Sequence, residues 1–335
     1  MSSSSSTPVP QNDLHRNAMR AGSFSPDVSV VVPVYGCAGC LEELTERVLA
    51  AIAGMGRTAE VIFVDDNSPD QAWSRICELS HLHAEVRGLR LSRNFGQHAA
   101  ISAGTSHARG NAIVVMDCDL QDVPEEIPAL LQALTHDVEI VLGQRIERRD
   151  TWFKRTGSRT FYRTLGWLTE TNYDPSTANF GAYSRQVIDA MNAMPETDRF
   201  LPLLARWTGF RTVRIPVEHA QRSEGKSGYT LGKLLQMATR IALSFSDKPL
   251  RLVMTASFAL TGVGLCVAAF AVYRYLMGDI RVAGFTSILA SVWLVGSFIM
   301  ASIGVVGLYV GRMHNETKRR PQYLVWQDSW SVRHD

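Results

Sequence analysis

Short apolar runs alternate with amphipathic segments through the first half of the chain, and polar residues close several of the runs. Runs of strand length cover residues 28–34, 60–64, 86–91, 113–116 and 138–142. Apolar residues at helical spacing predict helices over 41–53, from Ser68 to Leu79, over 99–108 and over 125–135. The alternation predicts an α/β domain with a mostly parallel sheet and helices on both of its faces.

Three of the predicted strands end in polar residues: Pro33-Val34-Tyr35, Asp65-Asp66 and Asp117-Cys118-Asp119. The carboxyl ends of parallel strands share one edge of a sheet, and ligands of open α/β sheets bind at that edge. We therefore expect these three segments, which are far apart in the chain, to meet at one cleft.

The segment after the fourth strand is suited to a metal ion. Asp117 and Asp119 point the same way in an extended chain because side chains alternate with period two, and Gln121 follows them. Mg²⁺ or Mn²⁺ is commonly bound by one or two carboxylates together with substrate phosphates. A plainer interpretation is that Asp122 caps a helix that begins near Pro124.

The sequence lacks the usual glycine-rich phosphate loops. No G-x-G-x-x-G follows the first strand and no G-x-x-x-x-G-K-[ST] occurs, so a nucleotide phosphate would need a metal and arginines. Residues 145–163 are rich in basic and aromatic side chains, which fits either a solvated helix or a segment that binds phosphates at a membrane surface. Nucleic acid is disfavoured, because 34 basic residues are nearly balanced by 32 acidic ones.

The remainder of the chain combines a short continuation of the domain with a strongly apolar end. Asp174 precedes a predicted strand, another strand covers 213–217, and Arg222 and Lys226 lie in a basic loop. Residues 229–245 form an amphipathic pattern, and 252–273 and 282–310 carry no charged side chain. Both uncharged stretches exceed the roughly 20 residues that a helix needs to cross a membrane, whereas a buried hairpin is the alternative.

These features predict six regions. They are a disordered Ser- and Pro-rich tail (1–26), the α/β domain (27–228), an interfacial helix (229–248), two transmembrane helices (250–274 and 282–310) and a tail (311–335). Because the first residues are polar and lack an apolar run, we expect no secretory signal. Basic residues flank the outer ends of the two spans, which places the domain and both termini in the cytoplasm by the positive-inside rule.

The five cysteines predict free thiols. Their number is odd, they are scattered, and Cys37-x-x-Cys40 has no second pair to complete a zinc site. We therefore expect reduced cysteines in a reducing compartment, in preference to a redox or zinc role.

Several of these motifs together resemble a known family. In order and spacing, VSVVVPVY, VDDNSPD, LSRNFGQHAAISAG, DCDLQDVPEEIP, the FKR at 153–155 and RSEGKSGYTLGKLL resemble the polyprenyl-phosphate glycosyltransferases of glycosyltransferase family 2. That group includes dolichyl-phosphate mannose synthases, bactoprenol glucosyltransferases and undecaprenyl-phosphate aminoarabinose transferases. The resemblance covers residues 28–325, and the stretch at 93–128 and the tail RPQYLVWQ look closest to the undecaprenyl-phosphate branch.

The resemblance implies a GT-A fold, which is Rossmann-like, and an inverting transfer from a nucleotide sugar to a polyprenyl phosphate such as undecaprenyl phosphate. The donor would be UDP-linked in preference to GDP-linked, the partners would be the donor, the lipid acceptor and membrane lipids, and the product would feed cell-envelope glycan or lipid A modification. Relatives often form homo-oligomers, so a dimer or tetramer is expected.

Site roles carry over by position in the motifs. The metal and diphosphate would be bound by Asp117, Asp119 and Gln121, and the catalytic set would be Asp117, Asp119, Arg145 and Asp174. The nucleotide would be bound by Pro33, Tyr35, Asp65, Asp66, Arg222 and Lys226, and the acceptor phosphate by Arg155, Ser158 and Arg159. The cofactor would be Mg²⁺ or Mn²⁺.

Two departures stand out. Many relatives read P-V-Y-N-E-E where this chain has Cys37 after Tyr35-Gly36, and Ala is common where this chain has Cys118. Because Cys118 alternates away from the metal, we expect it to be harmless. Two other functions stay open at this point, a membrane-anchored nucleotide-sugar-binding scaffold without catalysis and a processive polysaccharide synthase. The latter is disfavoured because the chain lacks the Q-x-x-R-W signature.

Overall fold

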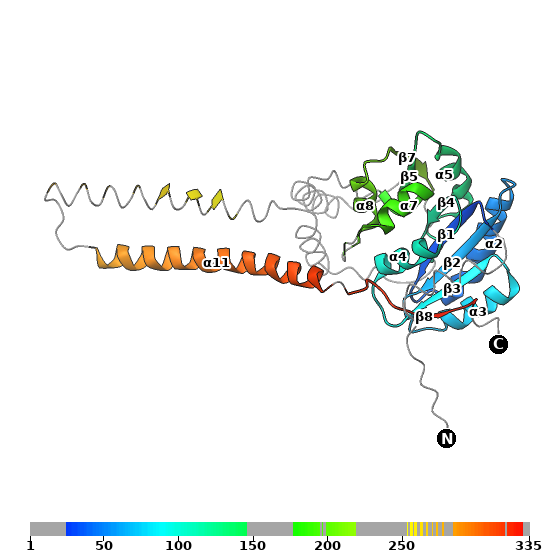
Figure 1. Cartoon of the computed structure of the whole chain (residues 1–335), viewed down its shortest axis with the longest axis horizontal. Coiled ribbons are helices and arrows are strands. Elements are labelled where there is room, and N and C mark those ends of the chain that lie inside the picture. The colour runs from blue at the N-terminus through cyan, green and yellow to red at the C-terminus, as the bar shows by residue number, and fades with distance from the viewer. Residues whose placement is uncertain are drawn as a thin grey trace, which may run out of the picture.

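The described part of the chain folds around an eight-stranded mixed sheet (Figure 1). The computed structural model describes residues 25–145, 177–194, 196, 199–218, 284–318 and 320–330, together with scattered positions between 253 and 277. The strands are β1 (Val28–Val34), β2 (Ala59–Asp65), β3 (Val86–Leu91), β4 (Ala112–Val115), β5 (Ile140–Arg145), β6 (Thr177–Ser184), β7 (Thr212–Val217) and β8 (Val325–Asp328). The helices are η1 (Ala38–Cys40), α2 (Leu41–Ala53), α3 (Ala72–Leu82), α4 (Gln97–His107), η2 (Pro124–Glu126), α5 (Ile127–Ala133), α7 (Arg185–Asn192), α8 (Leu201–Trp207) and α11 (Phe285–Thr317).

Most strands run in one direction, as the sequence predicts. The order is β7-β5-β6-β4-β1-β2-β3-β8, and β4, β1, β2 and β3 pair in parallel at its centre. Strand β6 is antiparallel to both β4 and β5, and β8 is antiparallel to β3. The carboxyl ends of β1, β2 and β4 therefore share one edge of the sheet, which is where the predicted cleft would lie.

Helices cover both faces of the sheet because the central strands are apolar on both faces. Val30 and Val32 belong to a buried cluster with α2, α3 and α5, whereas Val31 belongs to a second cluster with α4, α7 and α8. At Gly104 on α4, a Cβ atom would come within 2.3 Å of Val31 Cγ1. The missing side chain lets α4 lie close against β1, and this close packing sets where the helix begins relative to the strand ends.

The local predictions are largely confirmed, with one error at a helix start. The helix at 41–53 and the strands at 28–34 and 86–91 have the predicted bounds, and the other predicted elements of the first half differ by a few residues. Helix α3, however, begins at Ala72, after Gln71, and not at Ser68. The Ser68 hydroxyl instead donates to the Val34 carbonyl oxygen at 3.3 Å, so it connects two strand ends.

Strand β8 was not predicted. After α11 the chain returns to the sheet, and β8 pairs with β3 at its edge (Figure 1). Ser329 fixes this return, because Gly88 N–H donates to its Oγ at 2.8 Å and Ser329 N–H donates to the Gly88 carbonyl oxygen at 3.0 Å. The side chains of Arg87 and Arg90 lie over the rings of Trp330 and Trp326, at 4.1 and 4.9 Å from the ring centroids. The predicted C-terminal tail is thus partly a structural element of the domain.

Helix α11 overlaps the second predicted transmembrane segment and extends away from the sheet (Figure 1). Its large exposed apolar side chains include Ile288, Val292, Ile299, Met300, Ile303, Val306 and Val310. Among the residues that the structure describes, no helix is both long enough and apolar enough to cross a membrane. The two spans therefore stay predictions. Residues 1–24 of the predicted tail (1–26) and the predicted interfacial helix (229–248) lie outside the described residues.

Candidate functional site

The structure brings the three predicted strand ends together. Val34 pairs with Asp65 across β1 and β2, and Val31 pairs with Val115 across β1 and β4. Just past the strands, Asp66 N–H donates to the Val34 carbonyl oxygen at 3.0 Å, and Met116 N–H donates to the Val31 carbonyl oxygen at 3.2 Å. Tyr35, Asp66 and Asp117 therefore leave the sheet from neighbouring strands.

Asp65, at the end of β2, is almost fully buried and serves the local structure. Its side chain is 1% exposed, its Oδ1 accepts a hydrogen bond from Ser68 N–H at 2.9 Å, and its Oδ2 lies 3.4 Å from Nε of Arg90. Burial raises the pKa of this carboxyl, and the hydrogen bonds from Ser68 and the charge of Arg90 oppose that effect. Asp65 thus closes the turn after β2 and pairs with the arginine that lies over Trp326.

Asp66 fixes the beginning of α4. Its two carboxylate oxygens accept hydrogen bonds from Phe95 N–H at 2.7 Å and Gly96 N–H at 2.8 Å. Gly96, the residue before the helix, has φ +97°, a conformation that favours glycine. Burial raises the pKa of the Asp66 carboxyl against these two hydrogen bonds. The motif RNFGQH is therefore positioned by a carboxylate at the end of β2.

The end of β1 presents one side chain to solvent. Pro33 is a buried residue of β1 and pairs in register with Val64 on β2, so its side chain is not accessible to a ligand. Tyr35, two residues later, is 55% exposed at the edge. An exposed aromatic ring beside the strand ends can stack on a planar ligand group such as a base. Of the two predicted nucleotide-binding residues at the end of β1, Tyr35 is the accessible one.

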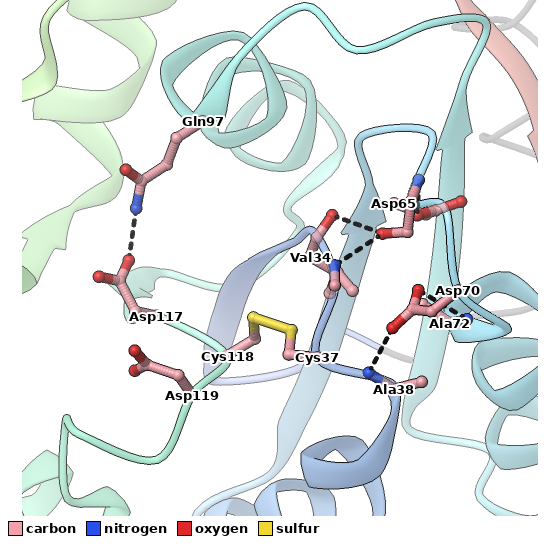
Figure 2. The surroundings of a disulfide bond; sticks show 12 residues. Val34, Cys37, Ala38, Asp65, Asp70, Ala72, Gln97, Asp117, Cys118 and Asp119 are labelled. Atoms are coloured by element: carbon pink, nitrogen blue, oxygen red, sulfur yellow. Dashed lines mark hydrogen bonds between the residues drawn. A yellow bond between two sulfur atoms is a disulfide. The ribbon is translucent and has the colours of Figure 1, made fainter. Parts of the chain in front are cut away.

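The loop after β4 presents Asp117 and Asp119 on one side. Both are partly exposed, and Figure 2 shows their carboxylates directed the same way while Cys118 points in the opposite direction. Gln121 is also partly exposed, and its backbone N–H donates to Asp119 Oδ1 at 3.3 Å. This is the alternation expected from an extended segment.

Two further residues shape this loop, and neither role was predicted. Asp122 is buried, and its Oδ2 accepts a hydrogen bond from Asp117 N–H at 3.1 Å. The plainer interpretation of Asp122 is therefore wrong, because the residue before η2 is Val123 and no side chain caps it. Leu120 has φ +59°, which is uncommon and strained for a residue with a β-carbon.

Gln97, the first residue of α4, reaches the same carboxylates. Its Nε2 donates to Asp117 Oδ1 at 2.6 Å (Figure 2). Asp66 is therefore linked to Asp117 through the backbone of residues 95–97 and the side chain of Gln97. A weak signal for this contact lies in the sequence, since Gln97 is a polar residue just before the run of small residues that begins at Ala99.

The cysteine prediction is wrong at two positions. Cys37, in the loop after β1, forms a disulfide with Cys118, in the loop after β4 (Figure 2). The two Cα atoms are 6.4 Å apart, and 81 positions separate the residues in the sequence. Counting and spacing gave no sign of the bond, because both loops must first be brought to the same edge of the sheet. Cys77 and Cys266 are free thiols, as predicted.

The residues of the β4 loop fit a hard divalent cation. They offer carboxylate and amide oxygens that are partly exposed, and Mg²⁺ and Mn²⁺ prefer such ligands and complete their shell with water and phosphate oxygens. No group of three or more His, Cys, Asp or Glu side chains that could hold a metal occurs among the described residues. The residues present therefore supply part of a coordination shell, with Asp117 and Asp119 as its anionic members.

Several predicted site residues lie outside the described part of the chain. They are Asp174, Arg155, Ser158, Arg159, Arg222 and Lys226. Arg145 is the last residue of β5, and only its backbone is described. Since β5 runs in the same direction as β4, its backbone ends at the same edge of the sheet as the β4 loop. The roles of these residues stay predictions.

Comparison with known proteins identifies relatives along most of the chain. The sequence model of Glycosyl transferase family 2 matches residues 29–191. An uncharacterised glycosyltransferase of Synechocystis sp. is 32% identical over 307 residues, which are 91% of this chain and 96% of the relative. An undecaprenyl-phosphate 4-deoxy-4-formamido-L-arabinose transferase of Aeromonas hydrophila is 33% identical over 303 residues, 90% of this chain and 93% of the relative.

A solved structure with a similar fold is the glucosyl-3-phosphoglycerate synthase of Mycobacterium tuberculosis in complex with Mn²⁺ and UDP-glucose. It is 16% identical in sequence, the TM-score is 0.45, and the match covers 71% of this chain and 83% of that chain.

Proposed function

This chain belongs to glycosyltransferase family 2 and is a glycosyltransferase, and we propose that it transfers a sugar from a nucleotide sugar to undecaprenyl phosphate or a similar polyprenyl phosphate. The donor is UDP-linked, the reaction needs Mg²⁺ or Mn²⁺, and the configuration at the anomeric carbon is inverted. The transfer takes place at the cytoplasmic face of the membrane.

The observation that carries the proposal is the placement of Asp117 and Asp119. Their carboxylates point to the same side of the edge where β1, β2 and β4 end, and Tyr35 is exposed at that edge. A nucleotide sugar needs a surface for its base and a cationic environment for its diphosphate. The edge offers an aromatic ring for the first and carboxylates that would bind a divalent cation for the second.

The lipid acceptor is supported by the relatives and by the composition of the C-terminal part. Relatives at about one third identity, such as the one from Aeromonas hydrophila, act on undecaprenyl phosphate by their names. Helix α11 exposes a series of large apolar side chains, and extended exposed apolar surface is typical of contact with lipid or with another protein. The uncharged stretches at 252–273 and 282–310 would anchor the domain beside its acceptor.

The chemistry requires positioning more than proton transfer. A phosphate oxygen of the acceptor attacks the anomeric carbon, and the bond from that carbon to the nucleoside diphosphate breaks with the electron pair leaving on the diphosphate. The second pKa of a phosphate monoester is about 6, so the nucleophile is already ionised at neutral pH and needs no general base. A bound divalent cation would neutralise charge on the departing diphosphate. The protein's own task is to hold two anions in line, which we assign to Asp117 and Asp119 through the cation and to Arg145.

The test is a transfer assay with the purified full chain in detergent. UDP- and GDP-sugars with a radiolabelled sugar are incubated with undecaprenyl phosphate and Mg²⁺ or Mn²⁺, and lipid-extractable label is counted. We expect product from one donor, lost with EDTA and with Asp119→Asn and retained with Asp137→Asn, an exposed acidic residue of the turn before β5. Absence of product across the whole panel from folded protein would contradict the proposal and favour a non-catalytic sugar-nucleotide-binding scaffold.

A further inference from the structure

The Cys37–Cys118 disulfide joins the two loops that form the site. We propose that it is a positioning element, which holds Asp117 and Asp119 in the arrangement that binds metal and releases them when a thiol reduces it. This inference rests on the proposed function, because it takes Asp117 and Asp119 as the metal ligands.

Cys118 is the residue between the two carboxylates. Its backbone is continuous with Asp117 on one side and Asp119 on the other, and its side chain points away from theirs and toward Cys37 (Figure 2). Cys118 is 9% exposed and belongs to the apolar cluster under α2, and Cys37 packs against that cluster. A covalent bond on the buried side of this residue therefore restricts the movement of both carboxylates on the opposite side.

The loop that carries Cys37 is a firm support. Ala38 N–H donates to Asp70 Oδ2 at 3.0 Å, and Gly36 N–H donates to Ser68 Oγ at 3.3 Å. Cys40 N–H donates to the Cys37 carbonyl oxygen at 3.1 Å, where the chain enters α2. The residues on both sides of Cys37 are thus bonded to the segment between β2 and α3. Through the disulfide, this support extends to the loop after β4.

The loop that carries Cys118 has reason to depend on such support. Leu120 adopts φ +59°, a conformation that persists only when the surroundings impose it. The hydrogen bonds from Asp117 N–H to Asp122 and from Gln121 N–H to Asp119 join residues within the same loop. Gln97 contacts Asp117 from α4, but through an exposed side chain, and Asp117 and Asp119 are themselves partly exposed. Without the bond to the β1 loop, the carboxylates would sample more positions, and a ligand set that must be ordered during binding binds more weakly.

The two cysteines are also the two departures from the family pattern that lie in this site. One stands in the segment after Tyr35 and the other stands inside the Asp-x-Asp motif, where Ala is common among the proteins that the chain resembles. The structure bonds these two departures to one another. We infer that they form one feature and that Cys118 is not a harmless replacement.

The bond would be reversible in the compartment proposed for this domain. Disulfides in the cytosol are usually transient and redox-sensing, because cellular dithiols reduce them. In that step the Cys37–Cys118 bond takes up two electrons and two protons and becomes two thiols, while a dithiol reductant loses two S–H bonds and forms its own disulfide. Reduction would therefore turn the site from an ordered to a loosened state without removing any metal ligand.

The experiment compares oxidised and dithiothreitol-reduced full-length protein in detergent, without ligand, by amide hydrogen exchange and by Mn²⁺ titration with electron paramagnetic resonance. On reduction we expect exchange at residues 117–122 to rise about tenfold and the Kd for Mn²⁺ to rise about tenfold, which is the effect typical of removing support from metal ligands. Cys37→Ser should show the reduced behaviour under both conditions. Cys77→Ser is the matched control and should respond as the wild type does, since Cys77 takes no part in the disulfide.

The outcomes separate this inference from the proposed function. Failure of Cys37 and Cys118 to pair in oxidised protein, judged by alkylation and mass spectrometry, would overturn the inference. So would a bond whose reduction leaves both exchange and Mn²⁺ affinity unchanged. If exchange rises on reduction but neither form binds Mn²⁺, the restraint on the loop is supported and the metal-dependent function is contradicted.

Discussion

The two acidic pairs at the carboxyl edge of the sheet follow similar buried strands but have different surroundings. Asp65 and Asp66 are 1% and 3% exposed, and their oxygens accept hydrogen bonds from backbone N–H groups of two neighbouring loops. Asp117 and Asp119 are partly exposed on a loop that is bonded from behind through Cys118. The first pair is built into the fold, whereas the second pair presents its carboxylates outward.

This difference indicates which pair can take a cation. A metal ion at Asp66 would have to displace two N–H groups from the carboxylate, and the loss of both bonds would leave buried donors without partners. At Asp117 and Asp119 a cation meets oxygens that water already reaches. Two acidic motifs, each at the end of a buried strand, therefore have different roles. Asp65 and Asp66 stabilise the loops at the edge of the sheet, and Asp117 and Asp119 are available to ligands.

The largest effect is expected on activity at Asp119. Asp119→Asn keeps the shape of the side chain but removes its charge, and we expect sugar transfer to fall on the order of 10²- to 10³-fold, the loss typical of removing one electrostatic contact to a transition state. The free energy of unfolding should change by less than about 0.5 kcal/mol, because the side chain is partly exposed. Transfer assays and urea unfolding of the same preparations measure both, and a large loss of stability would remove the contrast with Asp66.

At Asp66 we expect the large effect on the free energy of unfolding. Asp66→Ala leaves Phe95 N–H and Gly96 N–H without their acceptor, which should lower the free energy of unfolding by about 2–4 kcal/mol and loosen the start of α4. Urea unfolding checks the loss, and hydrogen exchange at residues 95–98 locates it. Glu46→Ala, an exposed residue on α2, is the control and should be neutral. A neutral Asp66→Ala variant would contradict the structural role.

His98, which follows Gln97 on α4, should make the free energy of unfolding depend on pH. Burial lowers the pKa of His98 from 6.5 to about 4, and its buried Nδ1 has no hydrogen-bond partner among the residues that the structure describes. Between these values the unfolded chain binds a proton that the folded chain does not, so stability is full above pH 6.5 and falls as the pH drops toward 4. By pH 5 the loss attributable to His98 should be about 2 kcal/mol.

The comparison with His98→Gln isolates that pH dependence. The wild type should lose more stability than the variant between pH 7.5 and pH 5. The raised pKa values of Asp65 and Asp66 act in the reverse direction, since their folded forms bind protons more readily, and they are common to both proteins. Parallel stability curves for the two proteins would show that His98 is not held neutral by its surroundings.

A smaller effect on stability is expected at Trp326 on β8, whose ring lies under Arg90. Trp326→Ala removes the ring under Arg90, the arginine that pairs with Asp65, and should lower the free energy of unfolding by about 0.5–1 kcal/mol. Leu324→Ala, at another exposed apolar residue just before β8, is the matched control. Equal effects of the two substitutions would argue against a specific contribution of the Arg90–Trp326 contact.

The sequence predicted most of what local patterns determine. Apolar runs and helical spacing located the central strands and α2, and the polar strand ends marked the edge where the site lies. Alternation also predicted that Cys118 points away from Asp117 and Asp119, as Figure 2 shows. These features depend on neighbours in the chain or on the rule that parallel strands end together.

Features that depend on distant partners were missed. Strand β8 is short and pairs with a strand from a distant part of the chain, since Asp328 on β8 lies opposite Leu89 on β3. No local pattern could therefore reveal it. The Cys37–Cys118 bond and the contact of Asp122 with Asp117 exist only once the loops have been placed at one edge. Both acidic pairs stand at the end of a buried strand, and this shared position likewise concealed that one pair is buried and the other partly exposed.

The most direct test of this division is a Mn²⁺ titration of three proteins by electron paramagnetic resonance: the wild type, Asp119→Asn and Asp66→Asn. If the outward pair binds the cation, Asp119→Asn should weaken Mn²⁺ binding by at least about tenfold, while folded Asp66→Asn should bind as the wild type does. Loss of binding in Asp66→Asn with binding intact in Asp119→Asn would contradict the account, because it would place the cation at the pair that we assign to the fold.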